Sequence, residues 1–170
     1  MALDLASEIS PEAAAVVTGS FLSGAMMGIS TLTVPVLLDT ASHPAQLVKQ
    51  WVTVYHYGHR VYPGLAIATC ALSGYAAYAR HEAGQPWRVF GLAGLMTVSI
   101  LPFTWTVMQA TNNSLFRAHR TQSQSGGREI SWQEARKLVA RWNWLHVVRS
   151  LLPLTGAVIC LLGYCEKLVL

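Results

Sequence analysis

The stretch Trp142-Asn143-Trp144-Leu145-His146-Val147-Val148-Arg149 decides how the rest of the chain is interpreted. Its residues Trp142, His146 and Arg149 are spaced i, i+4 and i+7, so a helix places them on one face. The 16 uncharged residues that follow, 150–165, make only about 24 Å of helix, against a hydrocarbon thickness of about 30 Å. A membrane-spanning helix here must therefore include residues 142–149, whose polar side chains then need partners.

The composition is typical of a membrane protein. Of the 170 residues, 52% are hydrophobic and only 12% are charged, which is unusual for a soluble domain. The net charge of +4 comes from Lys and Arg in the connections between apolar runs, as the positive-inside rule predicts for a membrane protein. We therefore expect a lipid bilayer as a partner and no nucleic acid.

Uncharged runs predict an all-α fold, a bundle of four transmembrane helices kinked by prolines. The runs 13–38, 61–79 and 89–116 contain 26, 19 and 28 residues, enough to span a membrane. The fourth helix ends in the run described above. We expect a single membrane-embedded domain over residues 1–170, with approximate helices at 11–38, 44–79, 87–116 and 131–166.

Local signals support these helix limits. Ser10 and Ser131 fit N-cap positions, and Pro44 fits the start of the second helix. Pro63 and Pro153 are expected to kink their helices, and Pro35 to bend or end the first one. The first run also carries a face of small residues that permits close helix packing or a homo-oligomer: Gly19, Ser23, Gly24 and Gly28.

The distribution of Lys and Arg predicts an orientation. Three of these residues fall at the membrane face that holds both termini, and eight at the other. The connections between helices 1 and 2 and between helices 3 and 4 are therefore predicted to be cytosolic, in the endoplasmic reticulum or another endomembrane. The cytosolic end of the bundle also collects His56, His59, Asn112, Trp142 and His146.

Three explanations are compatible with the histidines at this end of the bundle. His56 and His59 fit ordinary interfacial positions, and they also fit a base or cofactor ligand. Haem between facing helices is an alternative, although the chain has no c-type attachment motif. A metal site built on His56, His59 and His146 has no acidic residue near it in sequence, and we predict none.

Four motifs in order resemble those of the fungal anthrone oxygenases, a family of small four-helix membrane proteins. They are G-H-x-x-x-P at 58–63, P-F-T-W at 102–105, T-N-N-x-L-F at 111–116, and W-x-x-L-H-x-x-R-S with a following L-P at 142–153. The resemblance covers nearly the whole chain. One departure is that Gln109-Ala110 precede Thr111, where the family often has a proline. The helix geometry that aims Asn112 therefore need not follow the family pattern.

The resemblance implies an enzyme of fungal secondary metabolism. The expected reaction oxidises the central methylene of an anthrone, a flat aromatic polyketide, to an anthraquinone. O₂ would be the co-substrate, and no metal, haem or flavin is expected. Deprotonation of the methylene gives an electron-rich anthrolate that can itself reduce O₂, so the protein needs a base, an anion stabiliser and an aromatic pocket.

The residues found can fill these roles. His146 or His59 is the expected base, because a neutral imidazole with an unperturbed pKa of about 6.5 can accept a proton at cellular pH. His146 is preferred because Trp142 and Arg149 flank it on one helix face. Arg149 would stabilise the anion, and Asn112 would hold a substrate phenol or carbonyl. The expected substrate-binding residues are Trp142, Trp105, Tyr55, Met108, Thr104 and His56.

Two other classes of protein remain compatible with the sequence. In a non-enzymatic four-helix scaffold, the His, Asn and Arg side chains would only connect helix ends. In a haem or quinone redox protein, the histidines would instead serve the cofactor.

Overall fold

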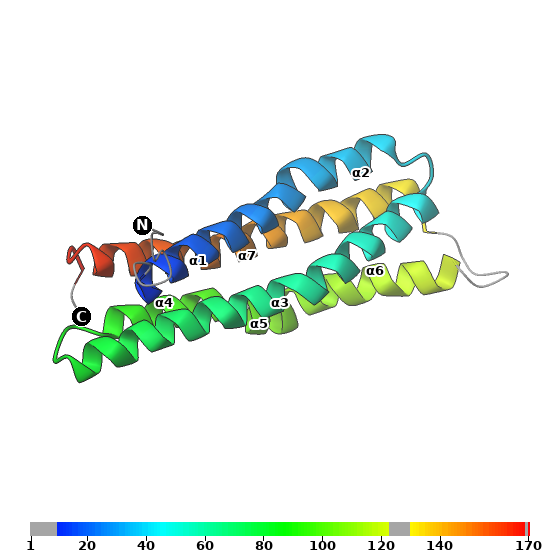
Figure 1. The fold of residues 1–170 in the computed structure, drawn as a ribbon. Coiled ribbons are helices and arrows are strands. Elements are labelled where there is room, and N and C mark those ends of the chain that lie inside the picture. Colours follow the sequence, from blue (N-terminus) through cyan, green and yellow to red (C-terminus); the bar gives the residue numbers. More distant parts are fainter. Residues whose placement is uncertain (1–9, 123–129, 169) are drawn as a thin grey trace, which may run out of the picture. The chain divides into compact units, whose positions relative to one another are not determined.

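The structure, a computed structural model, describes residues 10–122, 130–168 and 170. Four helical stretches follow one another (Figure 1). They consist of α1 (Pro11–Gly28), η2 (Ile29–Thr33) and α2 (Val34–Thr40); α3 (Pro44–Glu82); α4 (Arg88–Val98), α5 (Ile100–Phe103), η3 (Thr104–Met108) and α6 (Gln109–Gln122); and α7 (Trp132–Tyr164). The described residues contain no strand, so the all-α prediction is confirmed.

The helices begin where the capping residues predict. The Ser10 Oγ accepts a hydrogen bond of 3.2 Å from the Ala13 N–H, and the Ser131 Oγ accepts one of 3.2 Å from the Glu134 N–H. After α3 the chain turns through Gly84, whose φ of +68° favours glycine. The third stretch continues to Gln122, beyond the predicted end at residue 116, because its polar last turns remain helical after the apolar run stops.

Prolines do not end the helices. Pro63 and Pro153 lie inside α3 and α7, and Pro35 is the second residue of α2. Two π-helical segments that the sequence did not predict lie next to prolines: η2 ends two residues before Pro35, and η3 begins two residues after Pro102. Proline removes a backbone donor and crowds the preceding turn, and a wider π turn is one way in which a helix adjusts.

Three of the four stretches, 11–40, 88–122 and 132–164, are long and apolar enough to cross a membrane. The α3 helix is not among them, because Tyr, Gly, Thr and Ser side chains interrupt its uncharged half. Large apolar side chains on the three apolar stretches are exposed, including Phe21, Leu32 and Leu95 at 65%, 70% and 65%. Such exposure is expected of helices that face lipid.

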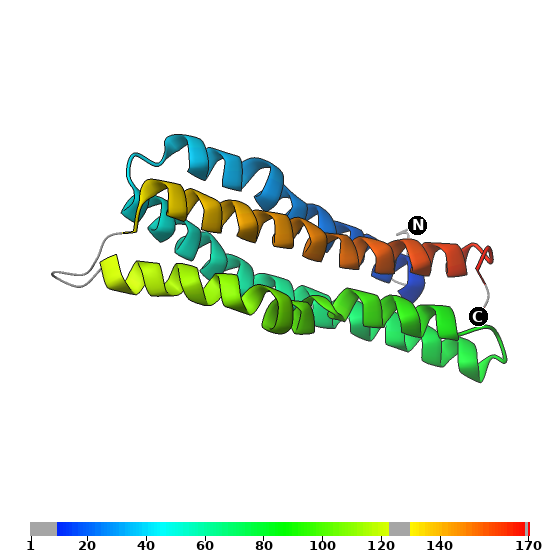
Figure 2. The ribbon, with the colours of Figure 1, turned by 180° about the vertical axis from the view of Figure 1, so that it is seen from behind.

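The helices form two compact units. One consists of Met1–Ser23, Pro63–Ile100 and Leu151–Leu170; the other, which we call the polar unit, consists of Gly24–Tyr62 and Leu101–Ser150. Each unit takes a segment from all four stretches, and within each unit these segments run alongside one another in both views (Figures 1 and 2).

The first unit is held by small residues and one ion pair. The Arg80 Nε donates to the Glu12 Oε1 at 2.9 Å and so connects the end of α3 to the start of α1. A Cβ at Gly19 would lie 3.4 Å from the Ala157 Cβ, in ordinary contact. The predicted small-residue face is thus only partly used, because Gly24 and Gly28 have no such neighbour within 4 Å.

We predict that Gly156→Ala destabilises the protein by about 1–3 kcal/mol, as overpacking of a close contact usually does. A Cβ at Gly156 would overlap the Thr97 Oγ1 and lie 2.7 Å from the Ala93 carbonyl oxygen. Thermal unfolding in detergent would measure the effect. Gly91→Ala is the control, because nothing lies within 4 Å of the added methyl group. Equal melting temperatures for the two variants would contradict this packing.

Candidate active site

Aromatic side chains fill the core of the polar unit. Trp51 of α3 is fully buried, with its ring centroid 5.7 Å from that of Trp142, 5.3 Å from that of Phe116 and 5.4 Å from that of Tyr55. Met108 of η3 is also fully buried and belongs to the same hydrophobic cluster. Side chains from α3, η3, α6 and α7 thus form one apolar environment.

Two residues of the predicted stripe on α7 are in contact. The rings of Trp142 and His146 lie 4.6 Å apart, and His146 is 1% exposed. Its Nδ1 lies 3.0 Å from the Oγ of Ser30, which is itself 3% exposed. If Nδ1 donates its proton to Ser30, the other ring nitrogen, Nε2, is left as the basic atom.

Each π-helical segment supplies a hydroxyl group to the stripe. Ser30 lies in η2, and the Asn143 Nδ2 donates to its carbonyl oxygen at 3.3 Å. Thr104 lies in η3, where its Oγ1 accepts a hydrogen bond of 2.8 Å from the Arg149 Nη1. A π turn moves the groups around it out of α-helical register and is frequent at functional sites. The two irregular segments therefore supply hydrogen-bond partners to His146 and Arg149 of α7.

Arg149 has no carboxylate within ion-pair distance in the part of the chain that the structure describes. The phenols of Tyr55 and Tyr62 lie within electrostatic range of its guanidinium. The Tyr62 hydroxyl donates to the Ala25 carbonyl oxygen at 3.4 Å. Within the described ranges the partners of this cation are hydroxyl groups. In an apolar helix bundle such a cation favours an anionic ligand, because an opposite charge would offset the loss of hydration.

Several buried polar atoms of the polar unit have no hydrogen-bond partner among the described residues. They include the Trp51 Nε1, the Trp142 Nε1, the Arg149 Nε and the Asn112 Oδ1. Asn112 is 5% exposed, so its amide oxygen faces protein and not solvent. An unsatisfied buried group costs about 1–3 kcal/mol. Such a group marks a place where a polar ligand would be stabilising.

The remaining predicted residues lie farther out. His59 is exposed and stacks on Tyr55 at 5.7 Å, and His56 is exposed beside the ring of Phe116. Tyr55 itself is half-buried. Trp105 is 64% exposed, so the structure does not bring it together with the buried group. Of the three histidines, only His146 is enclosed.

Sequence reasoning missed Ser30 and gave Trp51 no place in the site. A signal for Ser30 was present: Ser23 and Ser30 are seven residues apart, which places them on one helix face, and both are buried. Trp51 was indistinguishable from interfacial tryptophans, because its burial depends on contacts with side chains of other helices, among them Phe116 of α6 and Trp142 of α7.

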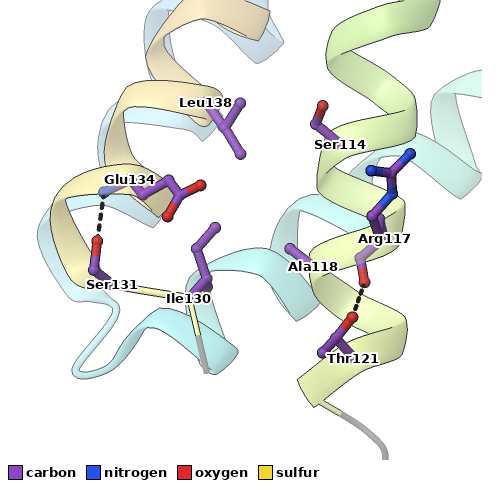
Figure 3. A pocket seen from close by; sticks show the side chains of 8 residues that line it. All are labelled: Ser114, Arg117, Ala118, Thr121, Ile130, Ser131, Glu134 and Leu138. Atoms are coloured by element: carbon purple, nitrogen blue, oxygen red, sulfur yellow. Dashed lines mark hydrogen bonds between the residues drawn. The ribbon is translucent and has the colours of Figure 1, made fainter. Parts of the chain in front are cut away.

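A separate pocket of about 600 Å³ lies between α6 and the start of α7 (Figure 3). Its polar lining includes Arg117 and Glu134, and Figure 3 shows α6 side chains on one side and α7 side chains on the other. The lining is Ser114, Arg117, Ala118, Thr121, Ile130, Ser131, Glu134 and Leu138. None of the predicted site residues is part of it.

These features define a class of protein: an all-α protein with helices apolar enough to cross a membrane, in which a buried imidazole and an arginine without a carboxylate partner among the described residues lie in aromatic surroundings. No three His, Cys, Asp or Glu side chains converge within the described residues. The arrangement can remove a proton from an apolar molecule and stabilise the resulting anion.

Comparison with known proteins gives the family. Residues 51–159 match the anthrone oxygenase family. A noranthrone monooxygenase of Aspergillus flavus is 50% identical over 94% of this chain and 75% of its own length. An anthrone oxygenase of Paecilomyces divaricatus is 52% identical over 92% of this chain and 96% of its own length. No solved structure matches. The chain belongs to the anthrone oxygenase family.

We predict that Ser30→Ala releases the His146 ring. Loss of one buried hydrogen bond should lower stability by about 1 kcal/mol and remove the preference for one ring tautomer. NMR of protein labelled with ¹⁵N-histidine would show one neutral tautomer in the wild type and a mixture in the variant. Thr31→Ala, which removes an exposed hydroxyl in the same segment, is the control. A His146 signal that Ser30→Ala leaves unchanged would contradict the contact.

Proposed function

We propose that the protein oxidises the central methylene of an anthrone to the ketone of an anthraquinone with O₂. The observation that carries this proposal is the buried His146, held by Ser30 and placed on one helix face with an arginine that has no carboxylate partner among the described residues. Relatives named noranthrone monooxygenase and anthrone oxygenase support the choice of substrate class.

The reaction divides into steps that these groups can serve. The His146 Nε2 removes a proton from the central methylene, and the negative charge of the anthrolate spreads onto the oxygen across the ring. The anthrolate passes one electron to O₂, and the two radicals combine, with a proton, to a hydroperoxide at the same carbon. Removal of the second C–H proton breaks the O–O bond and releases water. The sum is one methylene and one O₂ converted to one ketone and one water.

Other residues of the polar unit have roles in this scheme. Arg149, held by Thr104, stabilises the anthrolate oxygen in a medium of low dielectric, where a fixed positive charge acts strongly. Asn112 offers its unpartnered amide oxygen to a substrate phenol. The rings of Trp142 and Tyr55, together with Met108, provide the flat apolar surface that a tricyclic substrate needs. His56, Trp105 and the alternative base His59 lie outside this group.

The proposal includes catalysis without a metal, haem or flavin. An electron-rich anthrolate is itself able to reduce O₂, so the organic chemistry needs no other electron donor. The contacts of His146 support it, because its Nδ1 lies at hydrogen-bond distance from Ser30 and its ring packs on Trp142, and neither neighbour is a His, Cys or carboxylate of the kind that completes an iron or zinc site.

The proposal also places all four helical stretches across an endomembrane, with the connections 1–2 and 3–4 in the cytosol. The fourth crossing would be α3, whose uncharged run is long enough to span. An apolar polyketide dissolves in a bilayer, and a site enclosed by membrane helices can receive it from there. A homo-oligomer is compatible with Gly24, which is exposed, and Gly28, which is partly exposed, because both leave room for close approach of a second helix.

The test is turnover by the purified, metal-stripped protein supplied with emodin anthrone, followed as O₂ consumption and anthraquinone formation above the spontaneous rate. We expect turnover without any added cofactor. His146→Ala should lower kcat by about 10²–10⁴-fold, as loss of a general base does. Arg149→Ala should lower it by about 10²–10³-fold through loss of charge stabilisation. His59→Ala should change it by less than about threefold, because His59 is exposed.

Specific outcomes would contradict the proposal. Wild-type turnover in His146→Ala, with loss in His59→Ala, would transfer the role of base to His59. Recovery of activity only with added iron or haem would show that a cofactor is needed. Activity losses that only match the losses of stability in all variants would remove the catalytic roles of His146 and Arg149. His81→Ala is the matched control, because it removes a histidine of the first unit that has no role in the proposed site.

A further inference from the structure

The indole N–H groups of Trp51 and Trp142 are buried donors without an acceptor among the described residues. Trp51 is 0% exposed and Trp142 is 3% exposed, and each Nε1 is itself inaccessible. Their rings meet edge to face, with centroids 5.7 Å apart and an interplanar angle of 86°. The two donors therefore belong to one small region of the polar unit.

Ring faces nearby do not replace a true acceptor. Trp51 also has an edge-to-face contact with Phe116, and Trp142 has a tilted contact with the His146 ring. An N–H group directed at an aromatic face makes only a weak hydrogen bond. Buried tryptophans normally find a partner for the indole N–H, and two unpartnered ones in contact are unusual.

The other unpartnered atoms of the region indicate what kind of ligand would fit. The Arg149 Nε is a third buried donor without an acceptor, while the Asn112 Oδ1 is an acceptor without a donor. The three N–H donors, one of them cationic, fit ring-bound oxygen atoms that can carry negative charge. The unpartnered side-chain oxygens of Gln50, Asn112 and Asn143 fit the O–H groups of phenols. Aromatic walls fit a flat ligand.

We propose that the indole N–H groups of Trp51 and Trp142 donate hydrogen bonds to ring-bound oxygen atoms of a flat polyphenol, and so select hydroxylated anthrones over unsubstituted anthrone. This inference rests on the proposed function and deepens it. In this proposal Trp51 and Trp142 recognise the substrate by hydrogen bonds to oxygen atoms at particular ring positions. Trp51 has this role although it lies outside all four family motifs.

The test compares two substrates in two matched variants. Trp51→Phe and Trp142→Phe keep an aromatic ring and remove the N–H. The substrates are 1,8-dihydroxyanthrone and anthrone, which lacks the two phenols. The measured quantity is kcat/KM for 1,8-dihydroxyanthrone divided by kcat/KM for anthrone. Comparing this ratio in a variant with the ratio in the wild type cancels the intrinsic reactivity of the two substrates. We expect each variant to lower this ratio about tenfold, equivalent to about 1.4 kcal/mol.

Trp144→Phe is the control, since this tryptophan lies two residues from Trp142 and is 67% exposed. It should leave the ratio unchanged. Equal losses on both substrates in Trp51→Phe and Trp142→Phe would show that the rings only shape the core, and would overturn the proposal. Unchanged ratios in both would overturn it as well. If the wild type turns over 1,8-dihydroxyanthrone in the same assay, the proposed function holds. A failure of the ratio test then counts only against the proposed role of the two indole N–H groups.

A measurement on the wild-type chain covers the case in which a variant does not fold or the protein does not turn over. The six tryptophans can be labelled with ¹⁵N in the indole, and the unreactive 1,8-dihydroxyanthraquinone added to the protein in nanodiscs. Two buried indole signals should move downfield as their N–H groups gain acceptors, and anthraquinone without phenols should move them less. Binding of the dihydroxy compound with no movement of any buried indole signal would overturn the proposal.

Discussion

A polar side chain on a membrane-spanning helix must find its partners inside the protein, and this constraint organises the polar unit. The backbone N–H and C=O groups of α7 form hydrogen bonds within the helix, but the side chains of His146 and Arg149 need partners on other helices. Their partners are the hydroxyls of Ser30 and Thr104, each carried by a π-helical segment. Neither partner neutralises the positive charge of Arg149. The helices therefore hold an imidazole and a guanidinium in place, and among the described residues no carboxylate neutralises the guanidinium.

How far the sequence could predict this arrangement depends on the range of each interaction. Helical periodicity within one segment was sufficient to place Trp142, His146 and Arg149 on one face, and capping residues predicted where helices begin. Partners across helices, such as Ser30 for His146, depend on the rotation of two helices, which one sequence does not reveal. The choice between His59 and His146 as the base stayed open for the same reason. The structure adds that His146 is enclosed and His59 is exposed.

The position of Trp105 shows a second limit. An α-helical wheel assumes a constant angle between residues, but Trp105 lies in η3, where the wider π turn changes the direction of the side chains. The Trp105 side chain is 64% exposed, which the P-F-T-W motif did not indicate. The same segment supplies Thr104 to Arg149 and the buried Met108 to the aromatic core. One short segment thus holds one predicted residue that is exposed and two others that contact Arg149 and the aromatic core.

The central claim is that a buried histidine generates the anthrolate, and proton exchange without O₂ tests it most directly. In anaerobic D₂O, the protein should accelerate exchange of the central methylene hydrogens of emodin anthrone, followed by mass spectrometry, and His146→Ala should reduce the rate to the spontaneous value. This result would separate proton removal from the later reaction with O₂. Exchange by the wild type at the spontaneous rate, despite normal turnover in air, would contradict the account, as would unchanged exchange in His146→Ala.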